Sequence, residues 1–310
     1  MSDRIARLRA ALPALGAGSF LVTRSVNVRY LTGFDSSNVA LAVGADRVVL
    51  ATDGRYAESA RTLDGVEVVQ ADRDLLSWLG ARLDELAEAP VAFEADHVTV
   101  AGHESLLGGG AELLPTTGVL AGIRAVKDEG ELGLIRRAAR VTDNVYERLA
   151  QEAIVGRSEA EVAWWFEQAL HDEGADVPAF PVIVASGPNA ALPHHHPGDR
   201  EIGPEETVVV DAGAQVGGYC SDCTRTFATG PLPDELQRAY ALCRSAQESA
   251  LAGVRAGAVA SELDGIARTE IEESGLAPVL HGLGHGVGLE VHEEPVLRPT
   301  STDTLTAGNV

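Results

Sequence analysis

Apolar residues recur at the spacing of an α-helix in two successive stretches near the middle of the chain. Each stretch begins with a capping signature, because Asp128 is followed three residues later by Glu131, and Ser158 by Glu161. The first predicted helix runs to residue 154, and its apolar face consists of Leu132, Ile135, Ala139, Thr142, Val145, Tyr146 and Leu149. The second runs to residue 173 and is ended by Gly174.

The remainder of the second half combines strand and helix patterns. Strands are predicted over residues 180–185, 208–211 and 219–227, and helices over residues 234–253 and 261–275. The second and third strands form a hairpin, since Val216-Gly217-Gly218 between them is a turn sequence. Two helices followed by strands therefore occur twice, which indicates an internal duplication around a central, mostly antiparallel sheet.

The first part of the chain has the pattern of an alternating α/β unit. Its predicted helices cover residues 5–15, 54–63, 72–88 and 98–108, and its predicted strands cover residues 19–23, 39–43, 48–52 and 66–69. Loops are indicated at residues 108–110 and at Pro115-Thr116-Thr117-Gly118. The chain of 310 residues is long enough for two cores, and we place the boundary near residue 122. This gives an N-terminal domain of residues 1–122 and an α+β domain of residues 123–310.

Two aspartates of the predicted hairpin, Asp211 and Asp222, are candidate metal ligands. With Val216-Gly217 as the turn they lie directly opposite each other, with Cβ atoms roughly 4.5–5.5 Å apart. With Gly217-Gly218 as the turn they are diagonal neighbours on the same face. Two carboxylates so close repel each other, and a divalent cation removes that conflict. Hairpin aspartates are usually solvated surface charges, but the apolar run before Asp211 indicates a strand interior, so we favour the metal site.

Histidines supply the second kind of candidate ligand. Six of the nine fall in two clusters, which are His194-His195-His196 and His281, His285 and His292. His281 and His285 have the spacing of a helical zinc pair, but alternating glycines between residues 282 and 288 argue against a helix. A loop that enters a strand fits better, with residues 289 and 291 on one face and residues 290 and 292 on the other. His285 and His292 are seven positions apart, so the two need not bind the same ion.

Composition restricts the classes of function. The net charge of −22 argues against binding of nucleic acid or of an anionic membrane, because phosphate groups would be repelled. No apolar run approaches the roughly 18 residues of a spanning helix, and the start of the chain has no secretory apolar core. Three cysteines in a chain of this length indicate a reducing compartment, and we therefore predict a cytoplasmic protein.

Five segments together resemble the pita-bread metallopeptidases, which include Xaa-Pro aminopeptidases and prolidases, with creatinase and methionine aminopeptidase as more distant relatives. In the second half the similar segments are PVIVASGPNAALPHHHPGDREI, VVVDAGAQVGGYCSDCTRTF and LHGLGHGVGLEVHEEP. In the first part NVRYLTGFDSSNVALAV and VVLATDGRYAESA are similar to the accessory domain of creatinase and the Xaa-Pro peptidases. This accessory segment favours the Xaa-Pro and creatinase branch. The resemblance therefore implies a creatinase-like N-terminal domain followed by a pita-bread catalytic domain.

The resemblance implies that Asp211, Asp222 and His285 are metal ligands. Two divalent ions are expected in the family, where a metal-bridged hydroxide attacks the peptide bond before proline. Oxygen-rich ligation with one histidine suits manganese, and cobalt, zinc or iron would also bind. The expected substrate is a proline-containing peptide, and the expected assembly is a homodimer.

The resemblance also implies roles around the metals. His194 and His292 are expected to be catalytic, through contact with the substrate or the developing tetrahedral oxyanion. His281 is expected to line the substrate pocket, and Arg225 to supply a supporting charge for substrate binding. The other two histidines of residues 194–196 have no counterpart and are expected to be bystanders.

Two glutamate ligands of the family have no match in this chain. Glu290, Glu293 and Glu294 come too early in the sequence and are expected to belong to the histidine strand and the turn after it. We therefore expect the C-terminal part of the catalytic domain to be missing, with weak metal binding and impaired turnover. Two alternatives stay open at this point, which are a non-catalytic binding module with the same fold and a creatinase-like amidinohydrolase.

Overall fold

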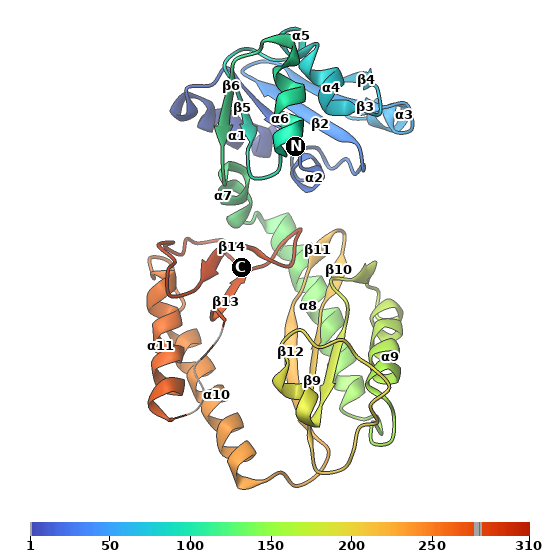
Figure 1. Ribbon diagram of the computed structural model, residues 1–310, viewed down its shortest axis with the longest axis vertical. Coiled ribbons are helices and arrows are strands. Elements are labelled where there is room, and N and C mark those ends of the chain that lie inside the picture. Colours follow the sequence, from blue (N-terminus) through green and yellow to red (C-terminus); the bar gives the residue numbers. More distant parts are fainter. Residues whose placement is uncertain (1, 276–278, 280) are drawn as a thin grey trace. The chain divides into compact units, whose positions relative to one another are not determined.

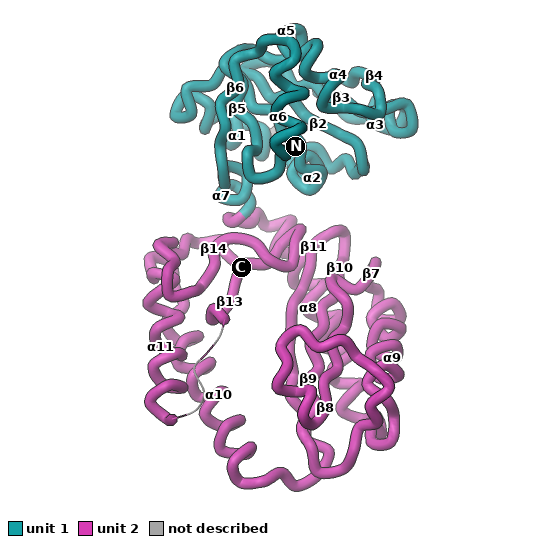
Figure 2. The backbone as a smooth tube through the Cα atoms, in the orientation of Figure 1, with its two compact units in different colours: residues 1–124 teal, residues 125–310 magenta. Residues whose placement is uncertain are grey.

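The computed structural model describes residues 2–275, 279 and 281–310. The chain divides into two compact units, Met1–Arg124 and Ala125–Val310, which Figure 2 colours separately. The sequence predicted the boundary near residue 122, and the structure divides after Arg124. Among the described residues, no helix is both long and apolar enough to cross a membrane.

The first unit is built on a six-stranded sheet in the order β4-β3-β2-β1-β5-β6 (Figure 1). Its strands are β1 Ser19–Val22, β2 Val39–Gly44, β3 Val48–Asp53, β4 Glu67–Ala71, β5 Val91–Glu94 and β6 Leu113–Thr116. Its helices are α1 Ser2–Leu15, α2 Ser25–Thr32, α3 Ala57–Ala60, α4 Leu75–Gly80, α5 Leu83–Leu86, α6 Val100–Leu106, the short 3-10 helix η1 Leu107–Gly109 and α7 Val119–Ala125. β1 pairs antiparallel with β2 and parallel with β5, so the sheet is mixed.

Two predictions for this unit are wrong. The predicted helix over residues 72–88 is two short helices, α4 and α5. The predicted loop at Pro115 and Thr116 is part of β6, because β6 is an edge strand and an edge strand tolerates a proline that cannot donate a hydrogen bond. The sequence patterns also missed α2 and β5.

The second unit begins with the two predicted helices, α8 Glu129–Leu149 and α9 Glu159–Asp172, and both capping boxes are present. Further helices are the 3-10 helix η2 Gly187–Ala191, α10 Asp234–Gly253 and α11 Ala260–Glu273. The strands are β7 Val177–Pro178, β8 Ile183–Ser186, β9 Thr207–Ala212, β10 Ala214–Val216, β11 Tyr219–Cys220, β12 Cys223–Ala228, β13 Gly284–Gly286 and β14 Glu293–Leu297. They form the ladders β11-β10-β7, β12-β9-β8 and β13-β14. Every strand pairing described in this unit is antiparallel, as predicted.

Helices α8 and α9 cover one face of the hairpin strands (Figure 1). Val208, Val210 and Ala212 point into this core and are fully buried. The Tyr146 hydroxyl of α8 reaches the carbonyl oxygens of Val210 at 2.9 Å and Cys223 at 2.7 Å, and so ties the helix to both β9 and β12. The opposite face of the same strands is left for the polar residues of the site.

The predicted strand over residues 289–292 is wrong. These residues form bends between β13 and β14, and the pairing shifts register between His285 and Gly286. The backbone here makes contacts elsewhere, because Val287 N donates to the Val310 carbonyl at 3.0 Å and the Gly288 carbonyl accepts from Cys220 N at 2.7 Å. These bonds draw the segment away from a continuous ladder.

Candidate metal centre

The hairpin register decides how Asp211 and Asp222 face each other. Asp211 lies opposite Thr224, and the turn consists of Gly217 and Gly218 with φ values of 59° and 87°. Both glycines take the left-handed conformation that a two-residue hairpin turn of this type requires. Direct opposition of the aspartates is therefore wrong, and the diagonal alternative is confirmed. Thr224 Oγ1 donates to Asp211 Oδ1 at 2.7 Å, which fixes one carboxylate oxygen.

Asp222 is held by a buried hydroxyl cluster beneath it. Its neighbour Ser221 bonds Thr142 of α8 through their hydroxyls at 2.8 Å. Ala214 N donates to both hydroxyls, at 3.0 Å to Ser221 and 3.1 Å to Thr142. This cluster breaks the ladder between β11 and β12, which the sequence patterns predicted as one strand. The break turns the Asp222 carboxylate toward the glycine-rich segment.

His285 and His292 meet Asp222 from the other half of the unit. The donor atoms of Asp222, His285 and His292 all lie within 4.8 Å of one another. His285 Nε2 is 3.5 Å from Asp222 Oδ2, and the two imidazole rings are 4.4 Å apart between centroids. His285 Nδ1 lies 3.0 Å from the Gly286 carbonyl oxygen. A proton on Nδ1 donated to that carbonyl leaves Nε2 free to ligate a cation.

The electrostatics of the two aspartates also fit a cation. Burial raises the pKa of Asp211, which the hydrogen bond from Thr224 opposes. Burial likewise raises the pKa of Asp222, and the nearby charge of Asp211 raises it further. Two carboxylates that are desolvated and repel each other gain most from a divalent cation. The donor set of oxygens and imidazole nitrogens suits a first-row divalent metal.

A pocket of about 370 Å³ opens beside these groups. His194, Asp211, Asp222 and His292 line its polar side, and residues 180–183 form an apolar wall. Asp211 lies within electrostatic reach of His194, His285 and His292. Four of the five predicted metal and catalytic residues thus line one pocket, and His285 lies next to it, 3.5 Å from Asp222.

The two predicted substrate-binding residues lie elsewhere. His281 lines a separate cavity of about 90 Å³ next to α11, and its carbonyl accepts from Arg268. Arg225 is on the opposite face of β12 from Thr224, which contacts Asp211, and its guanidinium lies 5.7 Å from the centre of the Tyr146 ring. Neither side chain lines the pocket of the aspartates.

Two further charged residues were not singled out by sequence reasoning. Glu159 of α9 is fully buried and binds His195, which lines the pocket beside His194. Lys127 forms a buried ion pair of 3.3 Å with Glu293, which begins β14. An acid in the first turn of a helix is ordinarily a solvated partner of the helix dipole, so the sequence pattern gave no sign that Glu159 is buried.

Comparison with known proteins identifies the fold family. The family model of metallopeptidase family M24 matches residues 133–310, and that of the creatinase/prolidase N-terminal domain matches residues 4–126. The chain is 32% identical to the uncharacterized peptidase YqhT of Bacillus subtilis, over 99% of this chain and 88% of the relative. It is 36% identical to the probable dipeptidase PepE of Mycobacterium tuberculosis, over 95% of this chain and 81% of the relative.

A solved structure agrees with these matches. The Xaa-Pro dipeptidase from Bacillus anthracis superimposes with a TM-score of 0.94 at 32% identity, covering 99% of this chain and 88% of that one. The comparisons do not support the expectation that the catalytic domain lacks its last part. The chain belongs to metallopeptidase family M24 and carries an N-terminal domain of the creatinase/prolidase type.

Proposed function

We propose that this chain is a metal-dependent Xaa-Pro peptidase, of the dipeptidase or aminopeptidase type, that hydrolyses the bond before proline. The observation that carries the proposal is the convergence of Asp222, His285 and His292 within 4.8 Å, beside Asp211, at the mouth of a pocket. The names of the relatives, a probable dipeptidase and an Xaa-Pro dipeptidase, support the substrate class.

Asp211, Asp222 and His285 would hold the divalent cation, for which manganese suits the oxygen-rich donor set. The cation supplies Lewis-acid polarisation of the scissile carbonyl and lowers the pKa of water. His194 and His292 line the same pocket and would donate hydrogen bonds to the oxyanion that develops on the substrate carbonyl. Residues 180–183 offer an apolar surface against which a prolyl ring packs.

Metal uptake and peptide cleavage test the proposal separately. Calorimetric titration of the metal-free protein with Mn²⁺ should show stoichiometric binding that Asp222→Asn abolishes. The metal-loaded protein should cleave Xaa-Pro dipeptides and leave matched Xaa-Ala dipeptides and creatine intact. Stoichiometric uptake without cleavage of any Xaa-Pro peptide would refute the peptidase, and cleavage of creatine would identify an amidinohydrolase instead.

Three further properties remain predictions, and each has a simple test. A cytoplasmic location would be seen by fractionation of the source cells. A homodimer would be seen by light scattering of the purified chain. Manganese as the native metal would be seen by elemental analysis of protein isolated without added metal.

A further inference from the structure

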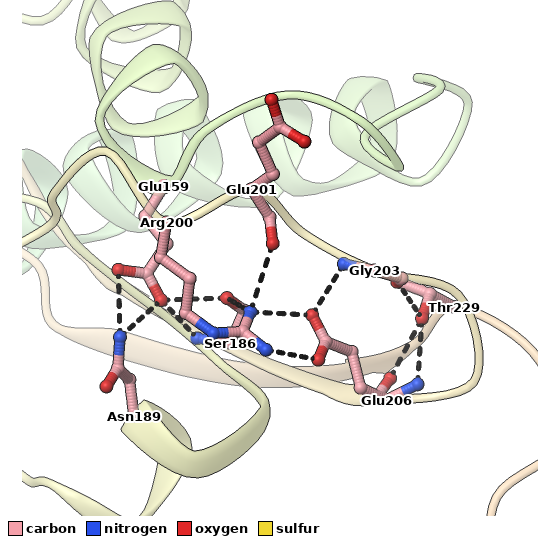
Figure 3. Close-up of polar contacts among 8 residues, drawn as sticks. All are labelled: Glu159, Ser186, Asn189, Arg200, Glu201, Gly203, Glu206 and Thr229. Carbon is pink, nitrogen blue, oxygen red and sulfur yellow. Dashed lines mark hydrogen bonds and ion pairs between the residues drawn. The ribbon is translucent and has the colours of Figure 1, made fainter.

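Glu159 is buried where an acid is not expected. It occupies the first position of α9, yet its residue surface is 0% exposed. Its Oε1 accepts from Ser186 N and from Ser186 Oγ, each at 2.8 Å (Figure 3). Asn189 Nδ2 adds bonds to Oε1 at 3.0 Å and to Oε2 at 3.2 Å. One carboxylate thus holds the end of β8 and the 3-10 helix η2 that follows it.

The same carboxylate holds the histidine loop. Oε2 lies 2.6 Å from His195 Nε2, and His195 keeps only 14% of its side-chain exposure. The backbone closes a turn around His194 as well, since His195 N donates to the Leu192 carbonyl at 3.2 Å. Glu159 is therefore bonded to residues on both sides of His194 in the chain.

The carboxylate is charged at neutral pH. Burial by itself would raise the pKa of Glu159, but the bonds from His195, Ser186 and Asn189 outweigh it and hold the pKa at about 2. Arg200 extends the network, because its guanidinium binds Ser186 Oγ and also pairs with Glu206 through two bonds of 2.8 and 2.7 Å (Figure 3). A charged, fully bonded network of this kind keeps its members in one arrangement.

His194 lacks such support of its own. Its side chain is exposed, and among the described residues no hydrogen bond to its imidazole is seen. Its position at the pocket wall must therefore come from its neighbours. A catalytic imidazole that shifts by about 1 Å can lose up to roughly 100-fold in rate.

We propose that Glu159 is a positioning residue, which fixes His194 at the pocket by binding His195. This inference rests on the proposed peptidase function. It also reassigns His195, which the sequence placed among the bystanders, as the link between a buried carboxylate and the catalytic histidine. Glu159 touches no substrate and acts through the loop alone.

Two variants and a matched control test the proposal. His195→Ala removes the link from a half-buried surface position and keeps the other bonds of Glu159, so it should fold. Glu159→Gln removes the charge with little change of shape. The control is Glu94→Gln in the first unit, since Glu94 is 5% exposed and accepts from Thr23 N at 2.6 Å and Arg24 N at 2.8 Å. Glu94→Gln changes a comparable buried carboxylate that has no bond to the described loop of residues 186–198.

The kinetic readout separates positioning from simple stability. His195→Ala and Glu159→Gln should each lower kcat for an Xaa-Pro dipeptide by roughly 10- to 100-fold with little change in KM. Glu94→Gln should keep kcat. When His194→Ala is already present, adding His195→Ala should cost no further activity, because a positioning residue has nothing left to position.

The second readout does not depend on activity. Amide hydrogen exchange of the metal-free protein should become faster over residues 186–198 in His195→Ala and stay unchanged there in Glu94→Gln. Unchanged exchange in His195→Ala, or losses that simply add in the His194 and His195 double variant, would overturn the proposal. A wild-type chain that cleaves no Xaa-Pro peptide would refute the peptidase function, and the exchange result alone would then decide the role of Glu159.

Discussion

Gly213 is the position at which a single methyl group should do most damage to the site. It joins β9 to β10, between Asp211 and the buried hydroxyl cluster. A Cβ atom at Gly213 would lie 1.9 Å from the Ser221 carbonyl oxygen and 3.0 Å from Cε1 of Phe180. Carbon and oxygen atoms in close contact stay roughly 3.3–3.6 Å apart, so the two backbone segments would have to separate by more than about 1 Å.

The cost of Gly213→Ala follows from that separation. Forcing an extra methyl group into a packed region costs about 1–3 kcal/mol, and each kcal/mol lowers Tm by about 2–4 °C in a unit of this size. The bond from Ser221 N to the Ala214 carbonyl, now 2.9 Å, would lengthen or break. Asp222 directly follows Ser221 and would move with it away from His285 Nε2. We expect metal affinity to fall by at least about 10-fold.

Thermal melts and calorimetric metal titration measure the two effects. The control is Gly133→Ala, since Gly133 is in α8 with no neighbouring atom within 4 Å of the added carbon. An alanine in a helix interior is favoured over glycine by roughly 0.5–1 kcal/mol, so this variant should melt slightly higher and bind metal normally. A Gly213→Ala protein with the Tm and metal affinity of the wild type would refute the argument from close packing.

Three other predictions follow from the charged groups. Asp222→Asn should raise the Tm of the metal-free protein at neutral pH, because it removes a carboxylate whose pKa is raised by burial and by Asp211, while metal affinity falls by more than about 100-fold; a lower Tm would contradict this. Glu159 has a folded pKa of about 2 against an ordinary value of about 4.3, so its stabilisation, about 3 kcal/mol, is present above about pH 5 and is lost as the pH falls toward 2. The free energy of unfolding, measured with urea between pH 2 and 6, should therefore depend less on pH in Glu159→Gln than in the wild type. An equal pH dependence in the two proteins would contradict this prediction. Arg268→Ala removes the bonds of 2.7 and 2.9 Å to the carbonyls of Val279 and His281. These carbonyls precede the glycine-rich segment that carries His285, so metal affinity measured by titration should fall about 10-fold. Arg244→Ala, which breaks an exposed pair with Glu248, should leave metal affinity unchanged, and an equal loss in both variants would refute the specific role.

Local signals predicted the helices of the second unit well. The predicted range 234–253 coincides with α10, and the capping boxes at Asp128 and Ser158 mark the starts of α8 and α9. These features were predictable because a capping residue and an apolar stripe act within one or two turns of the chain. The choice of hairpin register was not, since Val216-Gly217-Gly218 allows two turns and only the left-handed conformation of both glycines decides between them.

Contacts between distant segments account for what the sequence missed. The sequence grouped the two aspartates with His285, whereas the structure brings Asp222, His285 and His292 together. The closeness of His292 depends on the bends after Gly286, which the backbone bonds of Val287 and Gly288 accompany. Glu159 lies within the capping box that Ser158 and Glu161 form. The capping box accounts for the local sequence pattern, so this pattern did not predict that Glu159 is buried against the loop of residues 186–198.

The donors of the site come from two separate ladders of the same unit. Asp211 and Asp222 belong to the β9–β12 side, whereas His285 and His292 belong to the β13–β14 side. A cation bound by residues from both sides would stabilise the contact between these two parts of the unit. Removal of the cation should therefore weaken their coupling and make the unfolding of the unit less cooperative.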